Sequence, residues 1–168
     1  MKGNQIKYDI KDVTNDSTVA LTDFYWRDII PTDVTRLAKV VTGTYNQSVK
    51  FKITANTNKG NTLTIADNLK TTKNNVVDCS NAALGLPSDE YVTSVTLYFG
   101  NVKAGFAMVD NGAVFLNVLN INLPNGYQFS NKCDVGGQYN GEWAIGNATW
   151  TTSLYSPGGS GKLPKTGW

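Results

Sequence analysis

Two polar residues are predicted to point into the interior of the protein. Asp28 alternates with Phe24 and Trp26, so a strand would direct its carboxyl group to the side of the large aromatic rings. Asn131 alternates with Phe129 in the same way. Apolar surroundings disfavour the charged form of a carboxyl group, so a buried Asp28 without a cationic partner is expected to be protonated or hydrogen-bonded. Two simpler interpretations stay open: Asp28 could cap a turn, and Asn131 could satisfy a backbone group.

Most other catalytic chemistry is excluded by composition. The chain contains no histidine, which removes Ser-His-Asp and Cys-His nucleophiles and the zinc sites that need histidine. Its 13 acidic residues form no cluster of the kind that a calcium loop requires. A glycosidase needs two carboxylates across a cleft. The candidates for such a pair would be Asp134 and Glu142, but no sequence pattern favours them. We therefore expect no metal, no cofactor and no enzyme acting on other molecules.

The two cysteines, Cys79 and Cys133, lie far apart in the sequence and form no CxxC motif. That spacing does not favour a metal site or a redox motif. Two interpretations remain open. The cysteines form a disulfide if the protein is extracellular, or they are two separate small buried residues.

The elements that must position these residues are strands. Apolar and polar residues alternate over residues 6–10, 49–55, 95–99, 114–118 and 148–154. Turn sequences occur at residues 57–60, 110–112, 124–126 and 140–141. This pattern predicts an all-β, antiparallel fold of about eight or nine strands, a sandwich or a barrel. Only residues 80–86 are expected to make a helical turn.

Length and charge limit the remaining classes of protein. The chain has 168 residues, which suits one domain, and its formal net charge is +2. Nucleic-acid binding is not expected, because it needs a concentrated basic face. No transmembrane run and no signal peptide are found. We expect a sandwich domain over residues 1–155, a flexible Gly/Ser linker over 156–162 and a terminal motif over 163–168.

The terminal motif resembles the LPxTG sorting signal of Gram-positive surface proteins. The residues that carry the resemblance are Leu163, Pro164, Thr166 and Gly167. The resemblance implies a partner, a sortase, whose cysteine thiolate attacks the carbonyl of Thr166 and releases Gly167. An amine of peptidoglycan or of a pilus subunit then forms the new amide bond with the carbonyl of Thr166. The protein would be extracellular and anchored to the cell wall, and the chain a fragment without signal peptide and membrane tail.

The domain itself resembles the DUF11-like, immunoglobulin-type repeats of bacterial surface and pilin-like proteins. The resemblance rests on residues 12–17, on residues 21–31, which include Trp26-Arg27-Asp28, and on residues 129–132. It implies an immunoglobulin-like β-sandwich. In several such domains a buried lysine amine attacks an asparagine side chain and forms an isopeptide bond, assisted by a protonated acid.

The resemblance assigns the isopeptide roles to particular residues. Asp28 would be the acid and Asn131 the amide. The family takes its lysine from a strand that precedes the segment of residues 6–10. By alternation, the side chain of Lys2 would point into the interior, whereas that of Lys7 would point away from it. Lys39 is not at the position where the family places its lysine.

The expected function is that of a structural stalk domain of an anchored adhesin or pilin-like protein, with any host or glycan ligand bound through distal domains. The alternative is a carbohydrate- or host-ligand-binding module, because exposed aromatic residues on a sandwich can stack on sugar rings. Candidates for stacking are Tyr25, Tyr98, Tyr139, Trp143 and Trp150, of which Trp150, like Trp26, is expected in the core.

Overall fold

The computed structural model describes residues 4–154, a range that contains twelve strands and one short helix. The strands are β1 (Gln5–Ile10), β2 (Leu21–Ile29), β3 (Thr35–Val41), β4 (Thr44–Tyr45), β5 (Lys50–Thr57), β6 (Thr62–Lys70), β7 (Val76–Asp78), β8 (Val92–Val102), β9 (Met108–Asp110), β10 (Gly112–Val118), β11 (Tyr127–Tyr139) and β12 (Glu142–Leu154). The all-β prediction is confirmed. The expected number of strands was too low, because β4, β7 and β9 are too short to show alternation.

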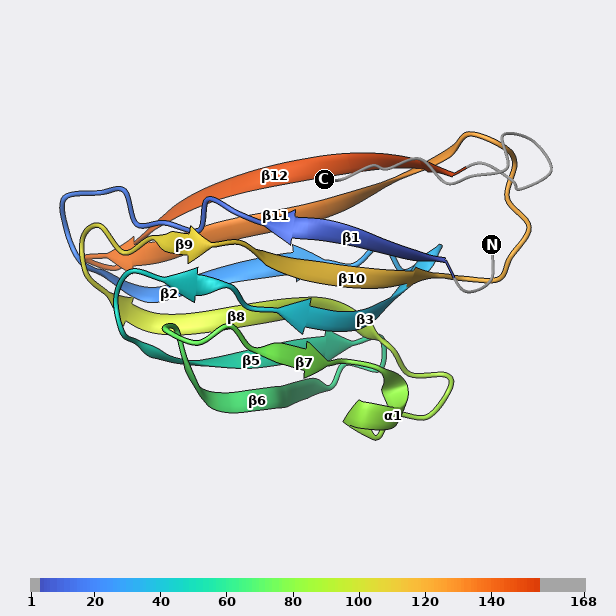
Figure 1. Cartoon of the computed structure of the whole chain (residues 1–168), viewed down its shortest axis with the longest axis horizontal. Helices are drawn as coiled ribbons and strands as arrows, with labels where there is room; N and C mark the ends of the chain where they lie inside the picture. The colour runs from blue at the N-terminus through green and yellow to red at the C-terminus, as the bar shows by residue number, and fades with distance from the viewer. Residues whose placement is uncertain (1–3, 155–168) are drawn as a thin grey trace.

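The strands form two main antiparallel sheets. One has the order β1-β10-β3-β7 and the other β12-β11-β2-β8-β5-β6, while β4 and β9 make a separate pair. In Figure 1 the strands of both sheets run along the long axis, with the four-stranded sheet nearer the viewer. The result is a β-sandwich in which most neighbouring strands are not consecutive in the chain.

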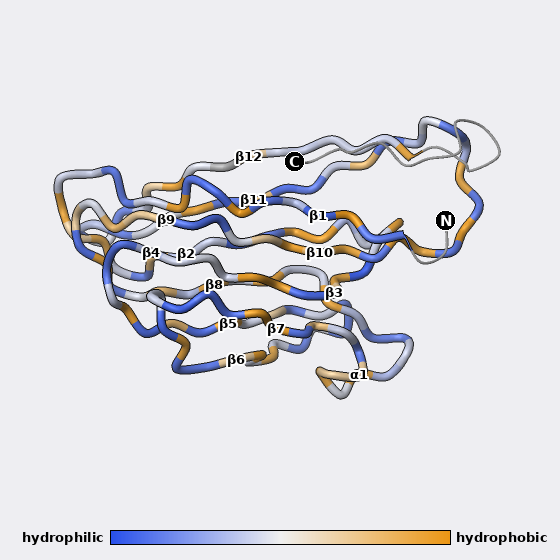
Figure 2. Tube along the Cα trace, in the orientation of Figure 1, coloured by the Kyte–Doolittle hydropathy of each residue, from blue (hydrophilic) through white to orange (hydrophobic). Residues whose placement is uncertain are grey.

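The core lies between the two sheets. On β1 the alternating residues Ile6, Tyr8 and Ile10 are buried, as their spacing predicts. Figure 2 shows apolar and polar residues alternating along the strands of both sheets. Burying one such large apolar side chain contributes about 1.5–3 kcal/mol. A cluster of aromatic rings fills one part of the core and comprises Phe24, Tyr45, Phe51, Phe99 and Phe106.

The single helix is α1 (Asn81–Leu84), inside the segment where a helical turn was expected. The side chain of Ser80 caps it by accepting a hydrogen bond from the N–H of Ala83. Gly85 ends it in the left-handed conformation, φ 68°, which glycine adopts without strain.

The segment of residues 12–20 between β1 and β2 is held by one buried asparagine. Asn15 donates from its amide nitrogen to the carbonyls of Val19 and Lys103. Its amide oxygen accepts from the N–H and the hydroxyl of Ser17. The Asn-Asp-Ser sequence thus serves to close this loop onto β8.

The disulfide considered for Cys79 and Cys133 is not formed, and both thiols are free. Cys79 follows β7, at one edge of the four-stranded sheet, and its N–H bonds to the carbonyl of Ala38. Cys133 belongs to β11, in the other sheet. In Figure 1 β7 and β11 lie on opposite sides of the molecule, so the fold separates the two sulfur atoms. The second interpretation, two separate cysteines, is the correct one.

Candidate functional site

Asp28 and Asn131 meet in the interior of the sandwich. The amide Nδ2 of Asn131 donates a hydrogen bond to Oδ1 of Asp28 over 2.7 Å. Asp28 is 0% exposed and Asn131 is 2% exposed. The inward direction that their alternation predicts is therefore confirmed for both side chains, and the turn-capping interpretation of Asp28 is wrong.

Two paired strands at the centre of the larger sheet bring these side chains together. β2 lies between β11 and β8, and Asp28 faces Cys133 on β11 and Val95 on β8. Asn131 is two residues before Cys133, on the same face of β11. The two polar side chains are thus diagonal neighbours, a separation that long side chains bridge.

Among residues 4–154, each member of the pair keeps one oxygen without a partner. Oδ2 of Asp28 and Oδ1 of Asn131 are buried and make no hydrogen bond to this part of the chain. Burial raises the pKa of Asp28 to about 7, while the hydrogen bond from Asn131 lowers it in part. Because an unpaired buried polar atom costs free energy, the site is suited to a group that can donate to both oxygens.

Two further side chains lie within electrostatic reach of Asp28. The charge of Asp28 helps to raise the pKa of the Tyr8 hydroxyl and of the Cys133 thiol, although burial is the larger cause for each. The hydroxyl of Tyr8, on β1, is hydrogen-bonded to the hydroxyl of Thr152, on β12. This contact joins the two sheets beside the site. The alternation of residues 6–10 predicted that Tyr8 is buried, but it gave no indication that its hydroxyl connects the two sheets.

No lysine among residues 4–154 makes a hydrogen bond or an ion pair with Asp28 or Asn131. Lys7 pairs with Asp9 at 3.5 Å, and the ammonium of Lys39 lies 4.4 Å from the ring centre of Phe115. Lys7 therefore faces outward, as its alternation with Ile6 and Tyr8 predicts. The ammonium of Lys39 packs against Phe115 on the neighbouring strand β10. Lys2 lies outside the described residues.

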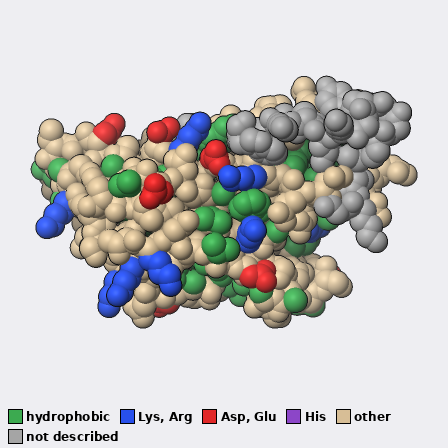
Figure 3. All heavy atoms as spheres, viewed as in Figure 1, with side chains coloured by type: hydrophobic (Ala, Val, Ile, Leu, Met, Phe, Trp, Pro, Cys, Tyr) green, Lys and Arg blue, Asp and Glu red, His purple; other side chains and the backbone are tan. Residues whose placement is uncertain are grey.

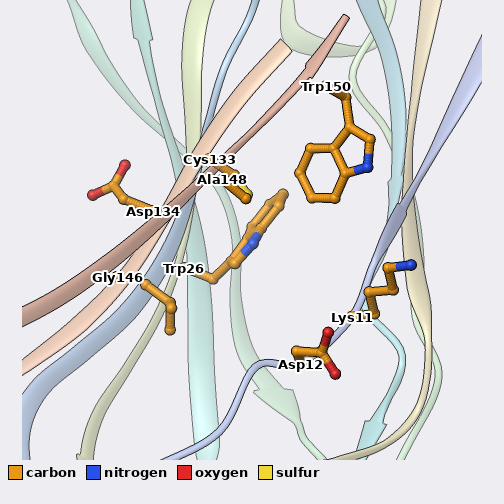
Figure 4. Close-up of a pocket in the computed structure, with 9 residues that line it drawn as sticks. Lys11, Asp12, Trp26, Cys133, Asp134, Gly146, Ala148 and Trp150 are labelled. Atoms are coloured by element: carbon orange, nitrogen blue, oxygen red, sulfur yellow. The ribbon is translucent and has the colours of Figure 1, made fainter. Parts of the chain in front are cut away.

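A cavity of about 250 Å³ is lined by Trp26 and Cys133, among others, each of which lies two residues along its strand from a member of the pair. Figure 4 shows the rings of Trp26 and Trp150 on one side of it, with Lys11 and Asp12 across from them. Trp26 is buried and Trp150 is packed against the core, as expected. Within the described chain β1 pairs with β10 alone, so the cavity lies beside a strand edge that is unpaired.

The remaining aromatic candidates lie outside the core. Tyr25 and Tyr98 are partly exposed, while Tyr139 and Trp143 are 50% and 51% exposed. Asn140 and Gly141 have φ values of 49° and 79°, the left-handed conformations of a tight hairpin turn between β11 and β12. Tyr139 and Trp143 thus belong to the two paired strands that the turn predicted at residues 140–141 connects.

The sorting motif at Leu163, Pro164, Thr166 and Gly167 lies outside the described residues. Within residues 4–154, no helix is long and apolar enough to cross a membrane. In the same range no group of three or more acidic or cysteine side chains is placed to hold a metal ion. Acidic and basic side chains both occur on the face that Figure 3 shows.

Comparisons with family models, with curated proteins and with solved structures find no match to this chain.

Proposed function

We propose that this chain is a structural stalk domain of a surface protein anchored to the cell wall of a Gram-positive bacterium. The observation that carries the proposal is the buried Asp28–Asn131 pair inside a β-sandwich whose sequence continues into LPKTG. A stalk domain needs a stable sandwich, and it is the substrate of the anchoring enzyme rather than a catalyst.

In this proposal Thr166 is the residue that becomes anchored. A sortase thiolate attacks the carbonyl carbon of Thr166, and the amide nitrogen of Gly167 leaves as an amine after taking up a proton. An amine of peptidoglycan or of a pilus subunit then attacks the thioester and releases the thiolate. Pro164 supports an extended conformation of the residue before it, which suits binding in a groove.

A transfer reaction tests this function. The chain is incubated with a sortase that reads LPxTG and with a fluorescent glycine peptide as the amine. We expect the label on Thr166 and release of the dipeptide Gly167-Trp168, both measured by mass spectrometry. Thr166→Ala should slow the transfer greatly, and Thr149→Ala, at an exposed threonine of β12, is the matched control. Equal rates for the parent and both variants would contradict the proposal.

We propose further that Asp28 and Asn131 are the acid and the amide of an isopeptide site. A neutral lysine amine would attack Cγ of Asn131. The protonated acid Asp28, which contacts Nδ2, would polarise the amide and carry a proton from the amine to Nδ2, which would leave as ammonia. The two unpartnered oxygens and the raised pKa of Asp28 support these roles. Lys2 is the candidate amine in this chain.

The intact mass of the chain tests the isopeptide proposal. A bond between Lys2 and Asn131 makes the chain lighter than its sequence mass by one ammonia. Asn131→Ala should then have the full sequence mass. If the parent chain has its full sequence mass, Lys2 is excluded as the reacting amine.

A further inference from the structure

A row of aromatic side chains crosses the outer face of the six-stranded sheet. Tyr25 on β2 pairs laterally with Tyr98 on β8 and with Gly136 on β11. The row continues to Lys52 on β5, next to Tyr98. The ring of Trp143, on β12, lies 5.8 Å from that of Tyr25 and is tilted edge-on to it. Neighbouring strands are spaced about 4.8 Å apart, so Tyr25 and Tyr98 extend from adjacent positions on this face.

Both tyrosine rings of this row are held by carboxylates. The hydroxyl of Tyr25 donates to Oδ2 of Asp134 over 2.6 Å. The hydroxyl of Tyr98 donates to Asp23, which also accepts from the amide of Gln138 at 2.8 Å. Figure 4 shows the carboxyl group of Asp134 on the other side of β11 from the interior. These bonds fix the rings before any ligand binds, which lowers the entropy cost of binding.

The backbone of β2 is irregular where it positions Asp23. The pairing of β2 with β8 shifts register between Leu21 and Phe24, which marks a bulge. Asp23 has a φ of 52°, a conformation that costs free energy for a residue other than glycine. The strained backbone keeps Phe24 in the core while the carboxyl group of Asp23 reaches Tyr98. Bulges and strain of this kind are concentrated at binding sites.

Most charges on this face are already compensated. Arg27 makes two hydrogen bonds to Asp134, each of 3.1 Å, and lies 5.7 Å from the ring centre of Tyr25. The ammonium of Lys52 lies 5.4 Å from the ring centre of Tyr98. With the carboxylates engaged in this way, the face complements a ligand that has no net charge but many hydrogen-bonding groups.

Two hollows adjoin the row. One, of about 250 Å³, includes Lys52 and Tyr98 at the β5 end of the row. The other, of about 420 Å³, is lined by Arg27, Ile29, Asp134 and Ile145, among others, and lies beside the row, further along the strands from Tyr25. The combination of a narrow aromatic row with polar groups along it and hollows beside it suits an elongated ligand. A protein partner would be matched by a broader apolar patch.

We propose that this outer face binds an uncharged oligosaccharide, whose sugar rings lie against Tyr25, Tyr98 and Trp143. A sugar ring has an apolar face for the aromatic rings and hydroxyls around its rim. Arg27, Gln138 and Lys52 are positioned to donate hydrogen bonds to those hydroxyls. This binding activity goes beyond the proposed stalk function and does not depend on the sorting of Thr166.

Titration calorimetry of the full 168-residue chain tests the proposal, with cellohexaose, xylohexaose, mannohexaose and chitohexaose as probes. We expect saturable binding of at least one probe with a Kd below about 1 mM. Trp143→Ala and Tyr25→Ala should each weaken that binding at least about tenfold. The absence of binding by all four probes would overturn the proposal.

The matched control is Tyr139→Ala. Tyr139 is as exposed as Trp143 and lies in the same hairpin, but its side chain alternates onto the opposite face of β11. The Tyr139→Ala variant should bind the probe with the same Kd as the parent chain. Circular dichroism should show that all variants are folded. Equal weakening by Tyr139→Ala and Trp143→Ala would overturn the assignment to this face. A dimer in light scattering that Trp143→Ala dissociates, without probe binding, would instead identify an interface between copies.

Discussion

Asn131 donates a hydrogen bond to Asp28 across two neighbouring strands, and within the described part of the chain the contact leaves a carboxyl oxygen and an amide oxygen buried without partners. A buried polar pair in which only some of the hydrogen-bonding atoms are satisfied is costly in a protein interior.

The first expectation concerns the pH dependence of stability. The pKa of Asp28 is about 7 in the folded protein, compared with 3.8 for an ordinary aspartate. The folded state therefore keeps the carboxyl proton up to a higher pH than the unfolded state does. The contribution of Asp28 to stability is therefore fully present below pH 3.8 and is lost as the pH rises to 7. The loss is about 4 kcal/mol.

Asp28→Asn removes this titration while keeping the size of the side chain. The free energy of unfolding, measured with urea from pH 4 to pH 8, should fall less steeply for the variant than for the parent. The difference should be confined to the interval between pH 4 and about 7. Parallel curves for the two proteins would contradict a raised pKa at Asp28.

The second expectation concerns the coupling of the pair. Asn131→Ala should destabilise the protein by about 1–3 kcal/mol, because Asp28 loses the side-chain donor that Asn131 supplies. In a cycle with Asp28→Ala and the double variant, the coupling should be about 0.5–3 kcal/mol. Additive effects would show that the two side chains do not interact in solution. Asn111→Ala, at an exposed asparagine between β9 and β10, is the control.

The third expectation concerns the contact between the two sheets. Tyr8→Phe removes the hydroxyl that bonds to Thr152, and both residues are buried. The variant should be less stable by about 1–2 kcal/mol, since the Thr152 hydroxyl keeps its desolvation cost. Tyr139→Phe, at an exposed tyrosine, should leave thermal unfolding unchanged. A Tyr8→Phe variant as stable as the parent would mean that Thr152 finds another partner.

The fourth expectation concerns the cysteines. Burial raises the pKa of Cys79 to about 12 and that of Cys133 to about 11, so both are thiols at neutral pH. Native protein should react slowly with iodoacetamide at pH 7.5. After unfolding without a reductant, both should be alkylated, giving two additions by mass spectrometry. Alkylation that appears only after reduction would demonstrate a disulfide.

Alternation along the chain was enough to predict much of this molecule. It located the all-β fold, the strands β1, β5, β8, β10 and β12 and the inward direction of Asp28 and Asn131, because the side-chain period of a strand is a local property. It did not reveal β4, β7 and β9, which are shorter than two periods. The roles of Lys2 and Thr166 rest on resemblance and stay predictions.

Contacts between strands were decided by the tertiary structure alone. The hydrogen bond of Asp28 with Asn131, the separation of Cys79 from Cys133 and the lateral row from Trp143 to Lys52 depend on strand order and register. That order, β12-β11-β2-β8-β5-β6, joins segments that are distant in the chain. Alternation assigns each side chain to a face, but only the packing of the whole core selects which strands are neighbours.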